Sequence, residues 1–536
     1  MPFLTAIDVV GIQRFVFASN RLKDVVSGSW LVHWSTAIDE VLKDLVDKDR
    51  VLLAAGGNVI VEFDTLNEAR SFACRYTRDL HDKAPGLDVA LIHRGYEKGK
   101  LSDALLKIQA DLARLKMEPK VSSPLLGLSV TAACRETGLP AVGFDTSTEP
   151  TVELLDPLGK EILKRREAVD KATQLWKKYL QAEHFHFPME LDQLGRTIGD
   201  SSFIGIVHVD GNGVGVRIKK WLEKKRNEDA DDDMVRDEYR EWSSGMDQLA
   251  DRVFRSIVRR VTGAITKNEK GDCEVRGKPE CLSFSLKIKG NGCYLPLRPV
   301  LVAGDDITFI SDGRIALDLA ETALSAFVKS NVPHLGKITA CAGIAIVPVH
   351  HPFYRAYELA ERLCANAKAD LRFKMQSEQG RFNEDCAMDW HIGVVPLGQP
   401  VGDFRKELYE KQPFSFTCRP YLLGSVESPE TWMWLSRKLL DDPKTGLRGQ
   451  VWTGHRNKAK KLGELIWEGP EQIKNAMKRW RAVSPKLRLP DDIKNDGFIA
   501  GKRTPLLDAM ELMDLYLALD GNDYWKNSQG EKEASP

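Results

Sequence analysis

Hydrophobic and polar positions follow one another in a β-α-α-β-β-α-β order over the first 95 residues. "FLTAIDVV" (3–10) is an apolar run of strand length, and "RVLLAAGGNVIVEF" (50–63) contains two β runs joined at Gly56–Gly57. A Gly-Gly pair between two such runs is typical of a β-hairpin. Residues 11–46 and 66–82 have helical spacing, and "LDVALIHRG" (87–95) predicts a closing strand.

The same order returns in the second half of the chain. "FIGIVHVD" (203–210) predicts a strand, "RPVLVAGDDITFI" (298–310) a hairpin and "KITACAGIAIVP" (337–348) another strand, with helical spacing between them. "CAMDWHIGVV" (386–395) predicts one more strand. We therefore expect an α+β protein with two ferredoxin-like palm domains, each an antiparallel sheet covered by helices on one face. Two such units indicate an internal duplication.

The remaining segments predict helical regions around the two palms. We expect a first palm over 1–105, a helical linker over 106–195, a second palm over 196–395 and a C-terminal helical domain over 396–536. The tryptophans of "ETWMWLSRKLL" and neighbouring segments are interpreted as core residues of that last domain.

Composition and charge exclude several classes of protein. The chain carries 77 Lys+Arg and 77 Asp+Glu, so no overall field draws it to nucleic acid or to a membrane. No apolar run approaches the ~20 residues that span a bilayer. The N-terminus has no basic leader and is interpreted as mature sequence. Nine cysteines without a C-x-x-C pair favour reduced thiols and a cytoplasmic protein.

Three carboxylates interrupt this apolar pattern. Asp210 ends the first strand of the second palm, while Asp305 and Asp306 occupy the tip of its hairpin. In a ferredoxin-like sheet these strands are neighbours, so the three acids should meet without a basic partner. A like-charge pair at ~4 Å costs roughly 4 kcal/mol at an effective dielectric of about 20. Such a cluster is normally held by a cation, and oxygen ligands select Mg²⁺ or Mn²⁺.

Glycines next to these acids indicate a phosphate site. "DGNGVG" begins at Asp210, and Gly304 precedes Asp305. Glycine lets a bulky ligand approach the backbone, whose N–H groups can hold phosphates. Each motif by itself also fits an ordinary hairpin turn or loop. Both at the ends of paired strands favour a metal site for nucleotide triphosphate chemistry.

The sequence resembles the large polymerase-like subunit of type III CRISPR effector complexes. The resemblance rests on "DVVGIQRFVFASNRL", "LLAAGGNVIVEF", "VHVDGNGVG", "VLVAGDDITFI", "CAGIAI", "AERLCANAKA" and "TCRPYLL", in that order. It implies a double-palm nucleotidyl cyclase that joins ATP into cyclic oligoadenylates for antiviral defence. The usual Gly-Gly-Asp-Asp motif stands here as Ala303-Gly304-Asp305-Asp306.

The resemblance also implies roles for single residues. Asp210, Asp305 and Asp306 would be catalytic and would bind two Mg²⁺ or Mn²⁺ ions. The turn from Gly211 would lie against the triphosphate, and Lys368 would hold phosphate oxygens, although a solvated helix lysine is an equally good reading of that position. The expected nucleotide-binding residues are Gly211, Asn212, Gly213, Gly215, Gly304 and Lys368 in the second palm and Gly56, Gly57 and Asn58 in the first.

The first palm is predicted to lack catalysis. Aligning "AGGNVIV" on "AGDDITF" places Gly57 and Asn58 where Asp305 and Asp306 stand. Asp8 alone cannot assemble a two-metal centre. The first palm would therefore bind a nucleotide or serve as a scaffold.

Two parts that are frequent in the family are not expected in this chain. The sequence enters the first palm at residue 3, which suggests a shortened form without an HD nuclease domain, and His81–Asp82 is read as a surface dipeptide. "CRETG" (134–138) has Thr137 where a zinc knuckle would have its second cysteine. Zinc is therefore not expected.

Two alternatives remain open. One is a free-standing cyclic-dinucleotide synthase, and the other is a non-catalytic scaffold subunit of an RNA-guided complex. The expected partners are nucleoside triphosphates and other CRISPR effector subunits with guide and target RNA, without a membrane. The intact acids favour the enzyme, whereas the neutral charge argues against tight RNA binding by this chain alone.

Overall fold

The computed structural model describes most of the chain, with gaps. The described residues are 1–118, 130–145, 156–180, 182–195, 202–269, 271–377, 385–396, 398–493, 496–500 and 502–521. Parts of the predicted linker (119–129, 146–155 and 181) therefore lie outside them, as do 196–201 and 378–384 of the predicted second palm and 522–536 of the predicted C-terminal domain.

The first palm is a four-stranded antiparallel sheet in the order β2-β3-β1-β4. Its strands are β1 (Phe3–Val10), β2 (Val51–Ala55), β3 (Asn58–Phe63) and β4 (Asp88–Gly95), and its helices are α1 (Ile12–Val16), α2 (Leu22–Thr36), α3 (Leu66–Lys83) and α4 (Leu101–Met117). Helix α2 ends earlier than the pattern over 11–46 predicted, because Ala37 adopts extended backbone with ψ 133°.

The second palm repeats this order in a larger sheet. β15-β16-β8-β19 corresponds strand by strand to β2-β3-β1-β4, and β20 and β23 extend the edge. The strands are β8 (Phe203–Gly211), β15 (Leu297–Ala303), β16 (Asp306–Asp312), β19 (Ala340–Pro348), β20 (Ala387–Ile392) and β23 (Tyr421–Leu422). The helices are α7 (Val214–Asn227), α8 (Asp232–Gly263), α9 (Ala316–Val328) and α10 (Phe353–Ser377). The predicted α+β class with two palm-like sheets is confirmed, but the second sheet is not wholly antiparallel as predicted, because β19 and β20 pair in parallel.

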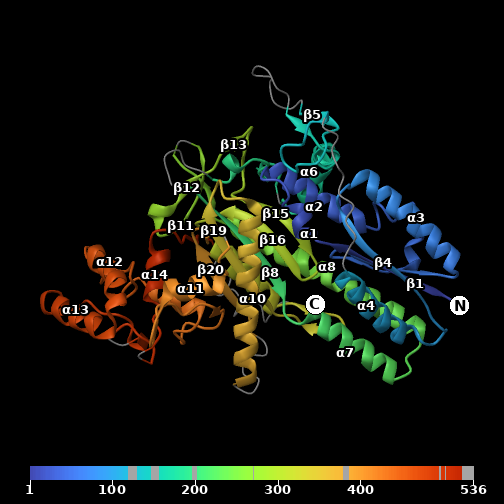
Figure 1. The fold of residues 1–536 in the computed structure, drawn as a ribbon. Coiled ribbons are helices and arrows are strands. Elements are labelled where there is room, and N and C mark those ends of the chain that lie inside the picture. Colours follow the sequence, from blue (N-terminus) through green and yellow to red (C-terminus); the bar gives the residue numbers. More distant parts are fainter. Residues whose placement is uncertain are drawn as a thin grey trace, which may run out of the picture.

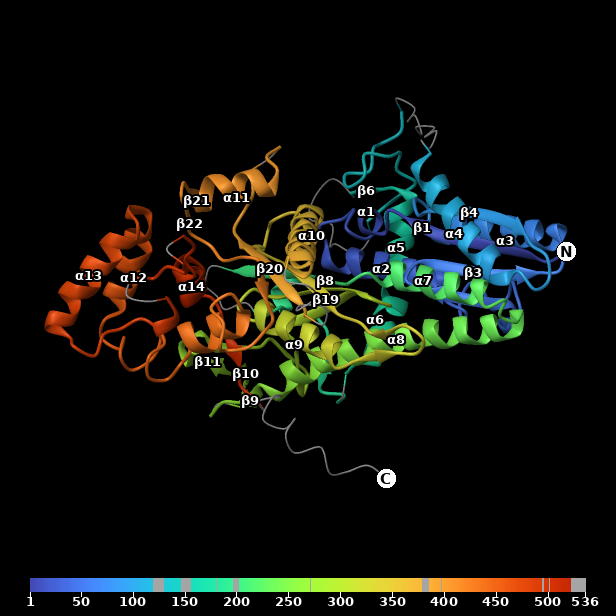
Figure 2. The ribbon, with the colours of Figure 1, turned by 90° about the horizontal axis from the view of Figure 1, so that it is seen from below.

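Helices cover both faces of the second sheet, and not one face as predicted (Figure 2). A Cβ atom on Gly343 would lie 1.9 Å from the Ala360 carbonyl oxygen of α10, so β19 packs directly under that helix. Gly343 is paired with His208 of β8. A Cβ atom on Gly205 of β8 would lie 2.3 Å from Ala316 of α9. Positions 205 and 208 point to opposite faces of a strand, so α9 and α10 lie on opposite sides.

The first palm has the same two-sided arrangement. Phe63 of β3 packs against Phe72 of α3, with ring centroids 5.2 Å apart. Asn58 of the same strand pairs with Asp8, which contacts Lys116 of α4. Because positions 58 and 63 face opposite ways, α3 and α4 cover different faces. Helix α4 is thus the counterpart of α10, and it runs across the boundary predicted at residue 105.

Shorter elements surround the palms (Figure 1). Between the palms are β5 (Gly143–Phe144), β6 (Pro157–Leu158), α5 (Lys160–Glu167), α6 (Val169–Lys177) and β7 (Phe185–His186). Inserted in the second palm are β9 (Ile265–Lys267), β10 (Cys273–Val275), β11 (Gly277–Lys278), β12 (Phe284–Ser285), β13 (Ile288–Lys289), β14 (Gly292–Tyr294), β17 (Asn331–Val332) and β18 (Gly336–Lys337).

The C-terminal part is mainly helical and packs against the edge of the second sheet. It contains α11 (Val401–Tyr409), β21 (Glu410–Lys411), β22 (Phe414–Ser415), a π-helix (Trp434–Leu440), α12 (Arg456–Leu465), α13 (Pro470–Val483), α14 (Leu506–Met513) and β24 (Ala518–Leu519). Trp432 and Trp434 are fully buried, and Trp432 packs edge-on against Trp390 of β20. These two tryptophans are core residues, as predicted, whereas Trp467 is 39% exposed.

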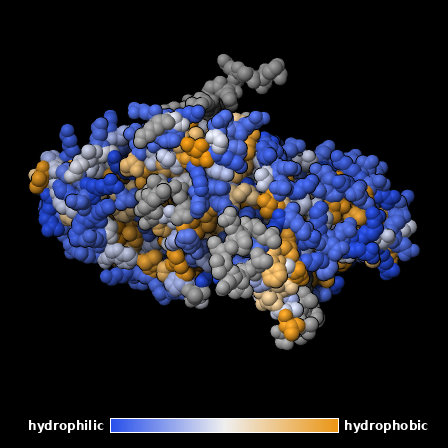
Figure 3. All heavy atoms as spheres, turned by 90° about the horizontal axis from the view of Figure 1, so that it is seen from above, coloured by the Kyte–Doolittle hydropathy of each residue, from blue (hydrophilic) through white to orange (hydrophobic). Residues whose placement is uncertain are grey.

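The surface agrees with the balanced composition. Figure 3 shows a mostly hydrophilic face on which hydrophobic side chains gather in separate small areas. Among the described residues, no helix has the length and apolar character needed to cross a membrane.

Candidate active site between the two palms

Strand pairing brings the two hairpin acids to the end of β8. Asp306 lies directly opposite Asp210 in the antiparallel register, so residues far apart in the sequence become cross-strand neighbours. A two-residue turn, Gly304–Asp305, joins β15 to β16. Gly304 has a φ of 60°, which favours glycine in this tight turn. All three carboxylates therefore lie at one end of the sheet.

Gly211 leaves room for Asp305 beside the end of β8. A Cβ atom at position 211 would lie 2.6 Å from the Asp305 Cβ atom. The Gly211 amide donates a 3.2 Å hydrogen bond to the Asp305 carbonyl oxygen, which holds the hairpin tip against β8. Burial, together with the charges of Asp210 and Asp306, raises the pKa of Asp305 to about 6. The protein groups around Asp305 therefore do not balance the negative charge of this cluster.

Lys368 is a basic partner of the cluster. Its Nζ lies 2.6 Å from the Asp210 carboxylate and donates a 2.7 Å hydrogen bond to the Gly211 carbonyl oxygen. The expectation that the acids would converge without a basic partner is wrong, because α10 crosses the face of the sheet to which Asp210 points. The lysine is 13% exposed, so the reading of a solvated helix residue does not hold.

His208 belongs to the same cluster and was missed in the sequence. It is 5% exposed, and its Nδ1 lies 3.4 Å from the Asp306 carboxylate and 3.1 Å from the Thr308 hydroxyl. Burial acts to lower the pKa of His208, but the Asp306 and Asp210 carboxylates outweigh it, so the pKa is raised. A histidine two residues before Asp210 shares its face of the strand, and this spacing was the available signal.

The glycine-rich turn leads from β8 into α7. The Asn212 amide donates to the Thr339 carbonyl oxygen at 2.7 Å, and its side-chain amide donates to the Thr339 hydroxyl at 3.0 Å. Gly213 has a φ of 68° and immediately precedes α7, with Gly215 in the first turn of the helix. The N-terminus of α7 therefore begins at the sheet end that carries Asp210, with its first backbone N–H groups free of helical partners.

The first palm has the same backbone register without the acids. Asn58 lies directly opposite Asp8, as Asp306 lies opposite Asp210. The registers therefore give the alignment that the sequence predicted. Asp8 is the one carboxylate at this position of the first sheet, because the amide side chain of Asn58 replaces the second.

The hairpin turn of the first palm differs from its counterpart. The Val9 amide donates a 2.8 Å hydrogen bond to the Gly57 carbonyl oxygen, which matches the contact between Gly211 and Asp305. Gly56 and Gly57 both have positive φ, 60° and 81°. A Cβ atom on Gly57 would also lie 2.6 Å from the Ile12 Cδ1 atom. Position 57 is thus suited to glycine and not to an aspartate.

Lys116 is a second residue that the sequence did not reveal. Its Nζ lies 2.7 Å from the Asp8 carboxylate, and the corresponding distance between Lys368 and Asp210 is 2.6 Å. Both lysines lie on the helix that follows the fourth strand of a palm. Each palm therefore has an aspartate–lysine pair at the corresponding place, although the two hairpin acids occur in the second palm alone.

A cavity of about 550 Å³ lies between the two hairpin tips. Its volume is in the range of small-molecule sites. The predicted site residues in its wall are Gly56, Asn58, Gly215, Gly304, Asp305 and Asp306, joined by Asp8 and Lys116. The remaining predicted residues lie outside that wall: Asp210, Gly211, Asn212, Gly213, Lys368 and Gly57. Both palms thus contribute to one chamber.

Comparison with solved structures relates this architecture to known proteins. A structure described as an apo Csm1–Csm4 cassette matches with a TM-score of 0.52 at 13% identity, covering 96% of this chain and 70% of that one. Csm1 of T. onnurineus matches with a TM-score of 0.51 at 14% identity, covering 96% and 69%. The chain has a Csm1-like fold. A Csm1–Csm4 cassette in complex with one ATP also matches, with a TM-score of 0.50 at 15% identity and coverage of 96% and 70%.

This fold is the one that the motif resemblance implied, so that prediction is confirmed at the level of the fold. No protein-family model and no curated protein matches the sequence. The similarity to Csm1 therefore lies in the arrangement of the elements, at an identity too low to assign residue roles.

Asp210, Asp305 and Asp306 are not prearranged as a metal-binding site in this structure. Within the described residues, no group of three or more His, Cys, Asp or Glu side chains is arranged to hold a metal ion. Lys368 is the cation nearest to Asp210 in this structure. The predicted metal ligands are thus assembled at one sheet end, with one of them engaged by a lysine.

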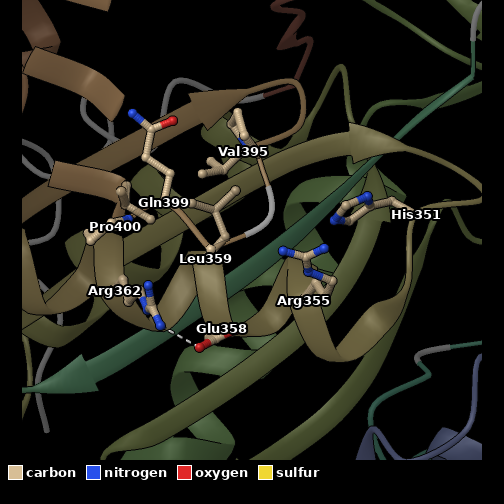
Figure 4. Close-up of a pocket in the computed structure, with 11 residues that line it drawn as sticks. His351, Arg355, Glu358, Leu359, Arg362, Val395, Gln399 and Pro400 are labelled. Atoms are coloured by element: carbon tan, nitrogen blue, oxygen red, sulfur yellow. Dashed lines mark hydrogen bonds and ion pairs between the residues drawn. The ribbon is translucent and has the colours of Figure 1, made fainter. Parts of the chain in front are cut away.

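A separate cavity of about 370 Å³ lies against the N-terminal half of α10 (Figure 4). Arg355 and His351 line it, and Arg362 forms a 2.5 Å ion pair with Glu358 at its edge. Arg355 is about 20 Å along the helix axis from Lys368, at ~1.5 Å per residue. This cavity therefore does not belong to the carboxylate site.

Proposed function

We propose that the chain is a metal-dependent nucleotidyltransferase that condenses ATP into a cyclic oligoadenylate in CRISPR-type antiviral defence. The observation that carries the proposal is the meeting of Asp210, Asp305 and Asp306 at one end of the sheet, where Asp305 and Asp306 line a cavity that both palms share. The Csm1-like fold supports it, because one structure of that fold is described as a complex with one ATP. The cyclic product and the defence role follow from the motif resemblance alone.

The donor set fits Mg²⁺ or Mn²⁺. Asp210, Asp305 and Asp306 supply hard oxygen ligands, and the raised pKa of Asp305 reports negative charge that the protein leaves unbalanced. When bound, the metal neutralises phosphate charge and lowers the pKa of the attacking hydroxyl. These three residues would hold the ions, and Lys368 would exchange its contact with Asp210 for one with phosphate oxygens.

The first palm would position a second nucleotide without activating it. Its Asp8 is paired with Lys116, and Asn58 provides an amide where the second palm has Asp306. Both residues line the cavity between the hairpin tips, so a nucleotide held there would lie close to the carboxylates. Holding two reactants in one chamber provides the proximity that 3′-hydroxyl attack on an α-phosphate requires.

Other effector subunits are the proposed partners. Two of the similar structures are described as Csm1–Csm4 cassettes. We therefore propose that this chain binds a Csm4-like subunit and works within an RNA-guided complex. The balanced charge of this chain favours guide and target RNA bound through partner subunits.

One observation favours the non-catalytic scaffold as the second candidate. Lys368 neutralises Asp210 at 2.6 Å, and the described residues contain no prearranged metal cage. In a scaffold this ion pair would be permanent, whereas in an enzyme Mn²⁺ and ATP would displace it. A free-standing cyclic-dinucleotide synthase would have the same site and differ in product.

Incubation of the purified protein with Mn²⁺ and each nucleoside triphosphate, followed by mass spectrometry, tests the proposal. We expect products from ATP and none when a chelator is present. A cyclic dinucleotide would identify the free-standing synthase. No product from any nucleotide, with or without partner subunits and RNA, would leave the scaffold as the function.

A further inference from the structure

A cavity of about 620 Å³ lies at the end of the second sheet opposite to the carboxylates. Elements α6, β7 and β13 and the start of β15 supply residues that line it. Arg298, which lines it, is five residues before Ala303 on β15, or about 17 Å at ~3.3 Å per residue. The cavity is therefore distinct from the chamber between the palms.

Arg298 is buried in this cavity wall with an incompletely satisfied guanidinium. The residue is 1% exposed, and within the described part of the chain neither its Nε nor its Nη2 has a hydrogen-bond partner. No carboxylate among the described residues forms an ion pair with it, and its guanidinium carbon lies 5.7 Å from the centroid of the Phe187 ring. An isolated buried charge is strongly unfavourable unless a counter-charge completes it. Burial accordingly lowers the pKa of Arg298 to about 9.

Other basic groups surround the same space. Lys177 and Lys289 line the cavity with His186. Burial, followed by the charges of Lys289 and Lys177, lowers the pKa of His186, so both lysines are close enough to act on this ring. Among the described lining residues the one acid is Glu183, which is exposed. The cavity wall therefore carries more positive than negative side chains.

The remaining wall is apolar and partly aromatic. Phe185 and Phe187 lie beside Leu180 and Met189. A planar guanidinium binds two phosphate oxygens at once, and a lysine adds a mobile point charge. The aromatic and aliphatic side chains of the wall provide a surface on which a flat or apolar group of the ligand can pack.

We infer that this cavity binds the phosphate group of a small ligand, with Arg298 as the central contact and Lys177 and Lys289 at the rim. The apolar wall would receive a base or other flat group when the ligand is a nucleoside phosphate. Such a site is independent of the catalytic proposal, because it shares no lining residue with the chamber between the palms.

The test measures protection of lysines in the full-length protein. Amine-reactive labelling, followed by mass spectrometry, is compared with and without AMP or inorganic phosphate, in EDTA so that no metal assists binding. We expect slower labelling of Lys177 and Lys289 and an unchanged rate at Lys474, an exposed lysine of α13. Protection by phosphate assigns the site to the phosphate group, and protection by AMP alone assigns it to a nucleoside phosphate. Protection by neither ligand would overturn the inference.

Substitution of Arg298 provides the second arm. In Arg298→Met the ligand concentration that gives half-maximal protection should rise at least about tenfold, as expected for loss of a charge-assisted contact. An unchanged midpoint would contradict the role of Arg298. If this variant does not fold, the Lys177→Ala/Lys289→Ala double variant is compared with Lys474→Ala by the rise in Tm that each ligand causes. Equal rises would also overturn the inference.

Discussion

At the residue scale, the site is a group of acids that basic side chains balance only in part. Lys368 neutralises Asp210 and His208 faces Asp306, but the pKa of Asp305 is still raised to about 6. The acids could be predicted from the sequence because each interrupts an apolar run at a strand end. The contacts of Lys368 with Asp210 and of Lys116 with Asp8 come from helices that pack on the sheets, and no local pattern encodes that packing.

The raised pKa of Asp305 predicts how stability changes with pH in the metal-free protein. Because the folded state binds its proton more tightly than the unfolded state, stability is highest below about pH 4 for this group and falls as pH rises through 6. Asp305→Asn should therefore stabilise the protein at pH 7 by about 1–3 kcal/mol. Chemical denaturation in EDTA at several pH values measures this. A variant less stable than the wild type at pH 7 would contradict it.

Unequal roles are predicted for the first acid of each palm. Asp210→Ala should reduce condensation by about 10²-fold or more, the range for loss of one preorganised electrostatic contact. Asp8→Ala should reduce it by less than about tenfold, because Asp8 has no hairpin acid opposite it. Initial rates with ATP and Mn²⁺ measure both variants. Equal losses would show that the first palm is catalytic.

At the element scale, periodicity predicted the four main strands of each palm, including both hairpins, but not the short strands β9 to β14, β17 and β18 that are inserted in the second palm. The placement of helices on two faces was not predicted, because the same apolar spacing serves a helix on either side of a sheet. The predicted boundary at residue 105 falls inside helix α4. It was misplaced because the role of α4 as the counterpart of α10 depends on its packing against β1 and β4, which the sequence does not show.

The two positions of the first palm's hairpin that correspond to Asp305 and Asp306 should differ in how well they tolerate an aspartate. Gly57→Asp should destabilise the first palm by about 1–3 kcal/mol, because a side chain there requires positive φ and contacts Ile12. Asn58→Asp, at the next position of the same hairpin, should be tolerated. Denaturant unfolding of the two single variants compares them, with neither expected to gain activity. A stable Gly57→Asp variant would show that the turn can rearrange.

At the scale of the whole molecule, helix α5 of the predicted linker is hydrogen-bonded to helix α1 of the first palm. The Arg165 guanidinium of α5 is buried and donates to the carbonyl oxygens of Phe15 and Val16 at the end of α1. Helix α1 begins at Ile12, whose side chain lines the chamber. The division into four domains remains a prediction, but this contact provides a physical path from the linker to the site.

That contact motivates a prediction about regulation. An enzyme that makes a second messenger for defence needs a low basal rate. A misplacement of ~1 Å between the palms can lower the reaction rate by about 10²-fold. We expect low activity from the isolated chain and activation by partner subunits that carry guide and target RNA. Steady-state rates with and without them measure this. Full activity of the chain alone, unchanged by partners, would identify a free-standing synthase.

Product formation by one matched pair of proteins tests whether Asp305 and Asp306 are catalytic. Wild type and Asp305→Asn/Asp306→Asn are incubated with ATP and Mn²⁺, in the presence of the partner subunits and RNA, and the products are resolved by mass spectrometry. We predict cyclic oligoadenylate from the wild type and none from the double variant, whose unfolding transition should match or exceed that of the wild type. Equal product from both proteins would contradict the assignment of this site.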